Sequence, residues 1–308
     1  ALAEFQQAMG QTGKCNVILL GHVDQPGVPL EKTLADAIDL DAMGLVVSRT
    51  DQWVSIESRD FVLSPEMVER IEAAAGRLAA RVSRIQTYLT NSISHARRTV
   101  VYSTITAVDP AGTPFPWLEL VDGTPARHLA EDEILINEWV GKELEAKPGD
   151  TIELSFFVVG PQEELHTESA AFRLAGIVAM TGLGADRALT PEYPGIRNMP
   201  DLAAWDPPFP VDLSKIQPRD EEYWDRFGAT PKAFVSEATG RRLWSTRYGA
   251  TTSLRIAPAA GSDKIVFSRN LTTELRSRLP LDLAGLRLRA VRQEALAAAA
   301  GSTDFGVL

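Results

Sequence analysis

Apolar and polar residues recur with two periods along the first part of the chain, and the two periods predict different elements. Residues 16–20 (Asn-Val-Ile-Leu-Leu) form a short apolar run, which predicts a buried strand. Residues 45–49 and 53–58 have strand length, and the second run alternates between apolar and polar positions. Between these runs, residues 30–38 place apolar side chains at helical spacing.

A second helix is predicted to begin at residues 64–66 (Ser-Pro-Glu). Serine accepts hydrogen bonds from free N–H groups, proline fits the first helical position, and a carboxylate favours the positive end of the helix dipole. Strands at residues 85–89 and 99–108 follow. This order of elements is typical of an α+β fold that carries its helices on one face of a mixed sheet.

The middle of the chain predicts a compact helix and hairpin. Four prolines between residues 110 and 125 mark a break in composition. A helix is then expected over residues 131–144, with acidic side chains at its start and an end at the Lys-Pro-Gly-Asp of residues 147–150. Residues 152–158 alternate as a half-buried strand does, and residues 169–180 form the returning strand.

Residues 189–218 contain seven prolines, and Trp205 and Phe209 lie among them. Because proline fixes φ and lacks a backbone donor, regular sheet or a long helix is not expected here. A long loop of this kind is either functional or a linker, and its aromatic residues favour a loop that packs on the core. A short helix is predicted over residues 220–227.

The end of the chain repeats the order of its beginning. Residues 252–257 predict a strand, and residues 265–279 predict a helix. Residues 286–291 alternate leucine with arginine and predict a last strand.

Composition narrows the classes of function. The 308 residues suffice for two domains or one large one. With 31 Lys and Arg against 41 Asp and Glu, the net charge is -10, which is unlike a nucleic-acid binder and disfavours adsorption to anionic lipid. The single cysteine, Cys15, excludes an internal disulfide, and its place before a predicted strand favours a small buried residue over a nucleophile.

The motifs of common active sites do not occur. The sequence has no G-x-x-x-x-G-K-[ST] phosphate loop, no G-x-S-x-G elbow and no H-E-x-x-H. The acidic clusters at residues 131–133 and 220–222 fit helix starts better than acid–base pairs. We therefore expect no catalytic residue, no cofactor and no metal site. The four histidines are scattered without ligand spacing: His22, His95, His128 and His166.

Four aromatic residues are candidates for contact with a partner or substrate: Trp205, Phe209, Tyr223 and Trp224. Aromatic side chains dominate the hot spots of protein interfaces. The alternative is that the same rings pack the proline-rich loop and its short helix onto the core.

One segment resembles a known family. It runs through residues 133–139 (Glu-Ile-Leu-Ile-Asn-Glu-Trp), 147–154 (Lys-Pro-Gly-Asp-Thr-Ile-Glu-Leu) and 172–178 (Phe-Arg-Leu-Ala-Gly-Ile-Val). This pattern is similar to the helix, Gly-Asp turn and strand pair in the large extracytoplasmic domain of FtsX/MacB-type ABC transporter permeases.

A second segment resembles a less studied bacterial subgroup of these permeases. It comprises residues 189–196 (Leu-Thr-Pro-Glu-Tyr-Pro-Gly-Ile), 205–210 (Trp-Asp-Pro-Pro-Phe-Pro), 223–224 (Tyr-Trp) and 230–234 (Thr-Pro-Lys-Ala-Phe). The tail, residues 301–306, looks like the approach to a transmembrane helix. The proline-rich stretch departs from the better-known members, so no ligand residue is carried over from them.

The resemblance implies a two-lobed α+β fold. A porter-like βαβ lobe would be built from both chain ends, residues 1–108 and 236–308. An inserted mixed α/β lobe would comprise residues 109–235. Such domains lie on the extracytoplasmic, periplasmic face of the membrane, between the first and second transmembrane helices of a membrane-integral protein.

The resemblance also implies a non-catalytic role and a set of partners. The domain would couple ATP-driven motion of the transmembrane helices to export or extraction of a substrate, or to a protein of the cell envelope. The expected partners are a cytoplasmic ATPase subunit, a second permease in a homodimer or heterodimer, and an envelope protein or lipoprotein; nucleic acid is not expected.

Two alternatives stay open. The first is a free, soluble ligand-binding or partner-binding protein of the cell envelope, and the second is a hydrolase with a dispersed site. The ends of the chain favour an excised piece of a longer protein, since residues 1–10 lack an initiator methionine and the features of a signal peptide. No apolar run reaches the roughly 20 residues that cross a bilayer.

Overall fold

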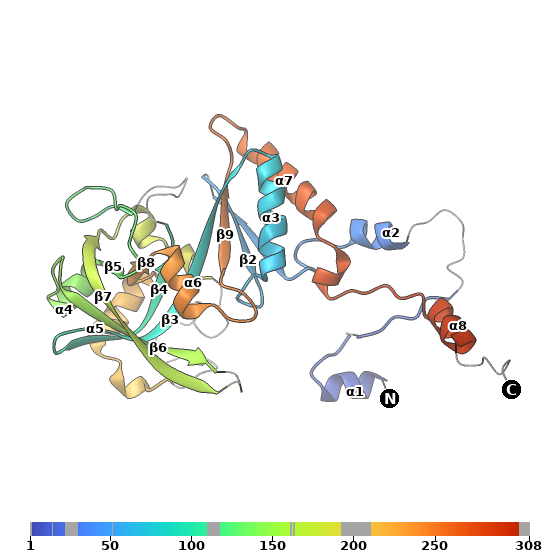
Figure 1. The fold of residues 1–308 in the computed structure, drawn as a ribbon, viewed down its shortest axis with the longest axis horizontal. Helices are drawn as coiled ribbons and strands as arrows, with labels where there is room; N and C mark the ends of the chain where they lie inside the picture. The colour runs from blue at the N-terminus through green and yellow to red at the C-terminus, as the bar shows by residue number, and fades with distance from the viewer. Residues whose placement is uncertain are drawn as a thin grey trace. The chain divides into compact units, whose positions relative to one another are not determined.

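The computed structural model describes residues 2–13, 15–21, 30–50, 52–109, 118–160, 162, 164–191 and 211–301. The protein is α+β with a mixed sheet, as the sequence predicts (Figure 1). Two compact units, Ala1–Ala37 and Ile38–Leu308, divide the chain. The first contains α1 (Leu2–Ala8) and α2 (Leu30–Ala37), which confirms the helix predicted there. Most of the two proline-rich stretches lies outside the described residues.

Within the described residues of the second unit, nine strands form one sheet in the order β1-β2-β9-β3-β4-β8-β5-β7-β6. The strands are β1 (Leu45–Arg49), β2 (Val54–Ser58), β3 (Arg81–His95), β4 (Arg98–Ala107), β5 (Glu133–Asn137), β6 (Thr151–Val159), β7 (Leu165–Val178), β8 (Ala233–Val235) and β9 (Ser253–Ala257).

The helices of this unit are α3 (Pro65–Arg77), α4 (Glu138–Leu144), α5 (Pro218–Phe227), α6 (Glu237–Trp244), α7 (Lys264–Arg278) and α8 (Val291–Gly301). Short 3₁₀ turns are η1 (Gly182–Ala185), η2 (Arg187–Leu189), η4 (Leu213–Lys215) and η5 (Leu281–Ala284). Among the described residues, the helices are too short or too polar to span a bilayer.

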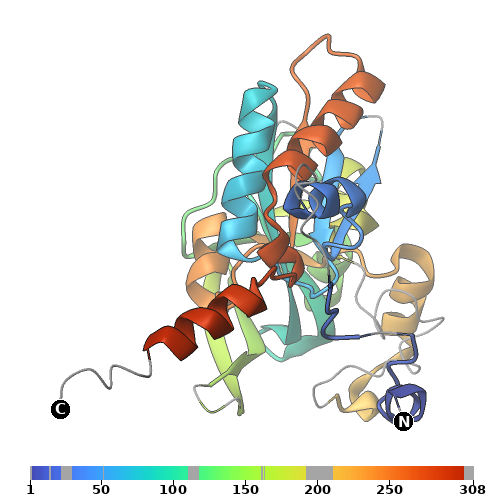
Figure 2. The same cartoon turned by 90° about the vertical axis from the view of Figure 1, so that its right-hand side faces the viewer.

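The first part of the sheet, here named the open sheet, consists of β1, β2, β9 and the beginning of β3, all paired antiparallel. Helices α3 and α7 lie side by side over one face of it (Figures 1 and 2). The Ser64 hydroxyl accepts from Met67 N at 3.2 Å and caps α3 as predicted. Ile56, Ile71 and Leu271 are buried between sheet and helices, so segments far apart in sequence share one core.

The second part, here named the strand ring, consists of β3 from Gln86 onward, then β4, β8, β5, β7 and β6. Each strand pairs with the next, and β6 pairs again with β3, with Leu154 opposite Ile93, so the hydrogen-bonded circuit closes. Two of its pairings, β4 with β8 and β5 with β7, are parallel, and the rest are antiparallel. Ile93, Ile136 and Phe156 are fully buried in its core.

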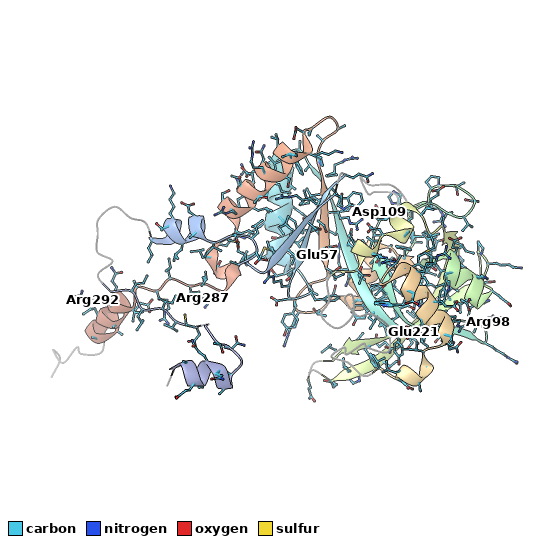
Figure 3. The ribbon with its side chains drawn as sticks, turned by 180° about the vertical axis from the view of Figure 1, so that it is seen from behind. Glu57, Arg98, Asp109, Glu221, Arg287 and Arg292 are labelled. Carbon is cyan, nitrogen blue, oxygen red and sulfur yellow. The ribbon has the colours of Figure 1, made fainter. Side chains whose placement is uncertain are left out.

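Strand β3 belongs to both parts. Its residues from Arg81 to Ile85 pair with β9, and those from Gln86 to His95 pair with β4. The boundary between the open sheet and the strand ring therefore lies inside β3. The domain boundaries expected at residues 108/109 and 235/236 stay a prediction. Figure 3 labels Glu57 in the open sheet and Arg98 at the far end of the ring.

The predicted strand at residues 16–20 is wrong. These residues are extended but exposed, Leu19 at 81%, and Cys15 is exposed as well, against the expectation of a buried residue. An apolar run becomes a strand only where a neighbouring strand supplies its hydrogen bonds. The described residues of the first unit form helices, turns and extended backbone without a strand.

The predicted strand at residues 286–291 is also wrong. Leu286 and Leu288 are each 46% exposed in extended backbone, and α8 begins at Val291. The Arg289 guanidinium pairs with Glu294 in α8 at 2.5 Å, so the alternating arginine serves the approach to a helix and not a strand pairing. Figure 3 shows Arg287 and Arg292 on this final segment.

The helix predicted to start at residues 131–133 begins later. Residues 133–137 are strand β5, buried along its whole length, and α4 starts at Glu138. The Asn137 side chain caps α4 by accepting from Val140 N at 2.9 Å. A short apolar run that is buried on both faces has no alternation, so it cannot be separated from a helix by periodicity.

The first residue of β5, Glu133, is a buried carboxylate held by two arginines. It accepts hydrogen bonds of 2.6 and 2.7 Å from Arg127, a bond from Arg173, and one of 3.1 Å from Ala130 N. The hydrogen bonds from Arg127 are the main reason that the pKa of Glu133 is lowered to about 2.

We expect Glu133→Gln to lower the free energy of unfolding by about 1–2 kcal/mol at pH 7, because the charge-assisted bonds are lost while both arginines stay solvated. The folded pKa lies below the unfolded value, so this stability is complete above pH 4.5 and is lost as the pH falls toward 2. Urea unfolding of both proteins between pH 7 and pH 2.5 measures the difference. A difference that stays constant over this range would contradict the ion-pair explanation.

Candidate functional site

The predicted contact residues separate into two groups. Trp205 and Phe209 lie outside the described residues. Tyr223 and Trp224 lie on α5, whose Glu221 is labelled in Figure 3, and both rings are buried. A partner can reach neither aromatic side chain unless α5 moves. The alternative that these side chains pack onto the core therefore describes Tyr223 and Trp224. The contact role of the four residues stays a prediction.

Trp224 packs in a small apolar cluster on the outside of β4. Tyr102 and Ala229 are its buried neighbours, and Leu89 and Val211 pack against them. The Tyr102 hydroxyl accepts a hydrogen bond of 2.6 Å from Asp212 N. This cluster therefore attaches the last part of the proline-rich stretch to the ring.

Tyr223 faces a polar cluster at the ends of β5 and β8. Its hydroxyl donates to Thr230 O at 3.1 Å and accepts from Asn137 Nδ2 at 3.0 Å. Its ring centroid lies 4.8 Å from that of Trp139. Burial raises the pKa of the Tyr223 hydroxyl, and the hydrogen bond from Asn137 opposes that shift only in part.

Lys232 is a buried cation in the same cluster. Its Nζ lies 4.7 Å from the ring centroids of both Trp139 and Tyr223, and 3.9 Å from Asp220 Oδ1. Its backbone N–H donates to Thr104 O at 2.8 Å, which places it between strands β4 and β5. Burial is the largest effect on its pKa, which is lowered to about 8.

The composition of this cluster is typical of contacts that hold a helix on a sheet. A lysine with a lowered pKa is also a candidate nucleophile or base. However, its ammonium faces two aromatic rings and one carboxylate. These contacts fix α5 on the ring.

A cavity opens where β3 changes partners. One edge of β3 pairs with β9 up to Ile85 and with β6 from Thr90. The intervening edge, from Gln86 to Leu89, has no strand partner among the described residues, and a cavity of about 270 Å³ lies beside it. The break between β9 and β6 is therefore the structural origin of the cavity.

The walls of this cavity are mainly apolar. The open sheet contributes the turn at Phe61 and Val62, and the β6–β7 hairpin contributes Phe157, Val159 and Leu165. The other apolar walls come from Tyr88, Leu89 and Trp244. The Tyr88 hydroxyl donates to Phe157 O at 2.6 Å and holds the hairpin against β3.

The rim of the cavity carries two features that packing alone does not require. Val159 is 58% exposed and Leu165 is 41% exposed. Phe61 has a φ of 71°, which bulky side chains rarely adopt. Backbone strain and exposed apolar surface concentrate at binding sites.

The histidines of the described residues contact neighbouring backbone or carboxylate groups, and His95 also lies 3.4 Å from Asp150 through Nε2. His95 Nδ1 lies 2.9 Å from Thr151 O, His128 lies 2.7 Å from Asp109, and His166 lies 2.8 Å from Glu164. Within the part of the chain that the structure describes, no three His, Cys, Asp or Glu residues gather as metal ligands. His22 lies outside that part.

No family model and no curated protein matches this sequence. Among solved structures, the chain is similar to the periplasmic region of MacB from Actinobacillus actinomycetemcomitans. The TM-score is 0.37 and the identity 11%, over 79% of this chain and 84% of that chain. A domain of a permease protein from Porphyromonas gingivalis gives a TM-score of 0.33 and 13% identity, over 66% and 72% of the two chains.

Both descriptions agree with the family that the sequence motifs resemble. At these TM-scores and identities the likeness carries no argument about what this chain does.

Sequence reasoning missed both the lysine cluster and the cavity. Lys232 belongs to the quoted Thr-Pro-Lys-Ala-Phe segment, but a single lysine carries no signal that its side chain is buried. Gln86 and Leu165 come from different elements, and only the closing of the ring brings their neighbourhoods together. Residues 157–159 have the composition of a strand, and their sequence does not indicate that this part of the strand is exposed.

We expect Lys232→Met to change how stability depends on pH. The unfolded lysine titrates near pH 10.5 and the folded one near 8, so the unfolded chain binds more protons between these values. The free energy of unfolding of the native chain therefore rises by about 2 kcal/mol from pH 8 to pH 10 through this group, and the variant lacks that rise.

Urea unfolding at pH 8, 8.5 and 9 measures the slope, and this range stays below pH 10, near which tyrosine in the unfolded chain titrates. Lys147→Met, at an exposed position, is the matched control and should keep the slope of the native chain. Equal slopes in the native chain and Lys232→Met would show that the buried amine does not titrate as described.

Proposed function

We propose that this chain is the extracytoplasmic domain of an FtsX/MacB-type ABC transporter permease. In this role it makes and breaks no covalent bond. It relays ATP-driven motion of transmembrane helices to a substrate or partner in the cell envelope. The quoted sequence segments support the family, and the continuity of β3 is the observation that supports the relay.

The sheet geometry fits the two lobes that the resemblance implies. The open sheet with α3 and α7 is our candidate for the porter-like lobe. It combines β1 and β2 with β9 and α7, which come from opposite ends of the second unit. The strand ring is our candidate for the second lobe; it contains β5 to β8 of the predicted inserted lobe, together with β4 and most of β3, which the sequence assigns to the porter-like lobe.

A relay requires that a displacement of one lobe moves the other. Strand β3 crosses from the open sheet into the ring without interruption, and its backbone is hydrogen-bonded to β9 at one end and to β4 and β6 at the other. Close-packed interiors transmit strain because they compress little. A small motion of the open sheet would thus move the ring as a rigid body.

The partners follow from the same proposal. A cytoplasmic ATPase subunit would supply the energy through the transmembrane helices, and a second permease would complete a homodimer or heterodimer. An envelope protein or lipoprotein would meet the ring or the proline-rich stretch.

The second candidate is a free ligand-binding protein of the cell envelope. The apolar cavity beside β3 is the observation that favours it, since small-molecule sites are concave and largely apolar. The two candidates differ in whether the protein is anchored in the membrane.

The test uses the full-length protein in the cells that make it. Cys15→Ser and replacement of any cysteine outside these 308 residues remove the native thiols, and Arg98→Cys places a new one at the far end of the ring, where the Arg98 side chain is 48% exposed. We expect a membrane-impermeant maleimide to label Arg98→Cys in intact cells, and we expect the protein to stay in the membrane pellet after alkaline carbonate.

The matched control is Ser103→Cys, which is buried and should react only after denaturation. Labelling that requires permeabilised cells would contradict the extracytoplasmic location. Labelling in intact cells together with release by carbonate would favour the free binding protein.

A further inference from the structure

A second cavity adjoins the apolar one. It has a volume of about 330 Å³ and lies between the start of α3 and α6. The two cavities share four residues of their walls: Gln86, Thr246, Gly249 and Ala250. The apolar cavity and its neighbour therefore form a continuous surface with β3 beneath it.

The second cavity is charged. Its walls contain Arg84 and Arg241 together with the carboxylates of Glu69 and Glu237. Glu72 accepts from Arg84 at 2.6 and 2.7 Å, and Glu237 accepts from Arg241 at 2.5 Å, so two positive and three negative charges meet at this site. A group with a net negative charge would be repelled here, whereas a zwitterionic group can place its cation beside the carboxylates and its anion beside the two guanidinium groups.

The boundary between the cavities is a fixed turn. Thr246 and Gly249 exchange backbone hydrogen bonds of 3.0 and 3.1 Å. Gly249 has a φ of 137°, and a Cβ there would lie 2.5 Å from Leu63 O, so the turn packs tightly against the open sheet. Gln86 contributes to the walls of both cavities at this boundary.

The volumes limit the size of a ligand. Pockets for whole drug-sized molecules span roughly 300–1,000 Å³, so the apolar cavity at about 270 Å³ is suited to one apolar chain. Buried apolar surface would provide the affinity for the chain, and the charged cavity would fix the orientation of its head.

We propose that the two adjoining cavities form one binding site for a single-chain amphiphile, with its apolar chain beside Leu89, Phe157 and Leu165 and its zwitterionic head group between Arg84, Arg241, Glu69 and Glu237. This inference goes beyond the proposed relay and does not depend on it.

The test measures binding of dodecylphosphocholine to the 308-residue chain by titration calorimetry, below the micelle concentration of the detergent. We expect saturable binding of one molecule per chain. Phosphocholine, which lacks the alkyl chain, should bind at least a hundredfold more weakly. Dodecanoate has a net negative head group and should bind about tenfold more weakly.

Two variants probe the two halves of the site, and both change exposed or rim positions so that the fold is kept. Leu165→Glu places a charge at the apolar cavity and should weaken dodecylphosphocholine at least tenfold. Val121→Glu, at an exposed apolar position outside both cavities, should leave binding unchanged. Glu69→Lys makes the head cavity positive and should shift the preference toward dodecanoate by about tenfold.

Absence of saturable binding to the native chain would overturn the proposal. Equal affinities of Leu165→Glu and Val121→Glu for dodecylphosphocholine would also overturn it, because the alkyl chain of the ligand would then bind elsewhere. A preference between the two amphiphiles that Glu69→Lys leaves unchanged would overturn the assignment of the head group. None of these outcomes bears on the membrane location tested above.

Discussion

Backbone pairing along β3 is the constraint on which the rest of this structure depends. A strand has two edges, and β3 uses one of them for β4 and divides the other between β9 and β6. The open sheet and the strand ring consequently share one strand. Any rotation of one part against the other is therefore taken up along β3, between the stretch that pairs with β9 and the stretch that pairs with β6.

The same division of an edge produces the cavity. Because β9 ends its pairing at Ile85 and β6 begins at Thr90, the intervening residues face side chains in place of a strand. A single topological feature thus accounts both for a stiff connection and for an opening beside it. If a ligand occupies that opening, it lies at the position where the two parts of the sheet meet, which is where binding would alter the motion of one against the other.

Local signals in the sequence were sufficient for the α+β class and for most elements. Ser64 and the proline after it mark the start of α3, and the alternation in residues 152–158 identifies β6. The failures occurred where an element depends on a distant partner. Residues 16–20 and 286–291 have strand composition without a strand beside them, and β5 is buried on both faces, so it lost the alternation that would distinguish it from a helix. The site was not predictable for the same reason, since its walls come from β3, β4, β6, β7 and α6 and from turns that only the folded sheet brings together.

Native-state hydrogen exchange along β3 tests the shared-strand account most directly. If β3 joins the open sheet and the ring into one body, amides of Val82 and Ile85 should open with the same free energy and the same dependence on denaturant as those of Leu89 and Ile93. Two distinct opening free energies, with a step between Ile85 and Gln86, would show two units that unfold separately and would contradict the account.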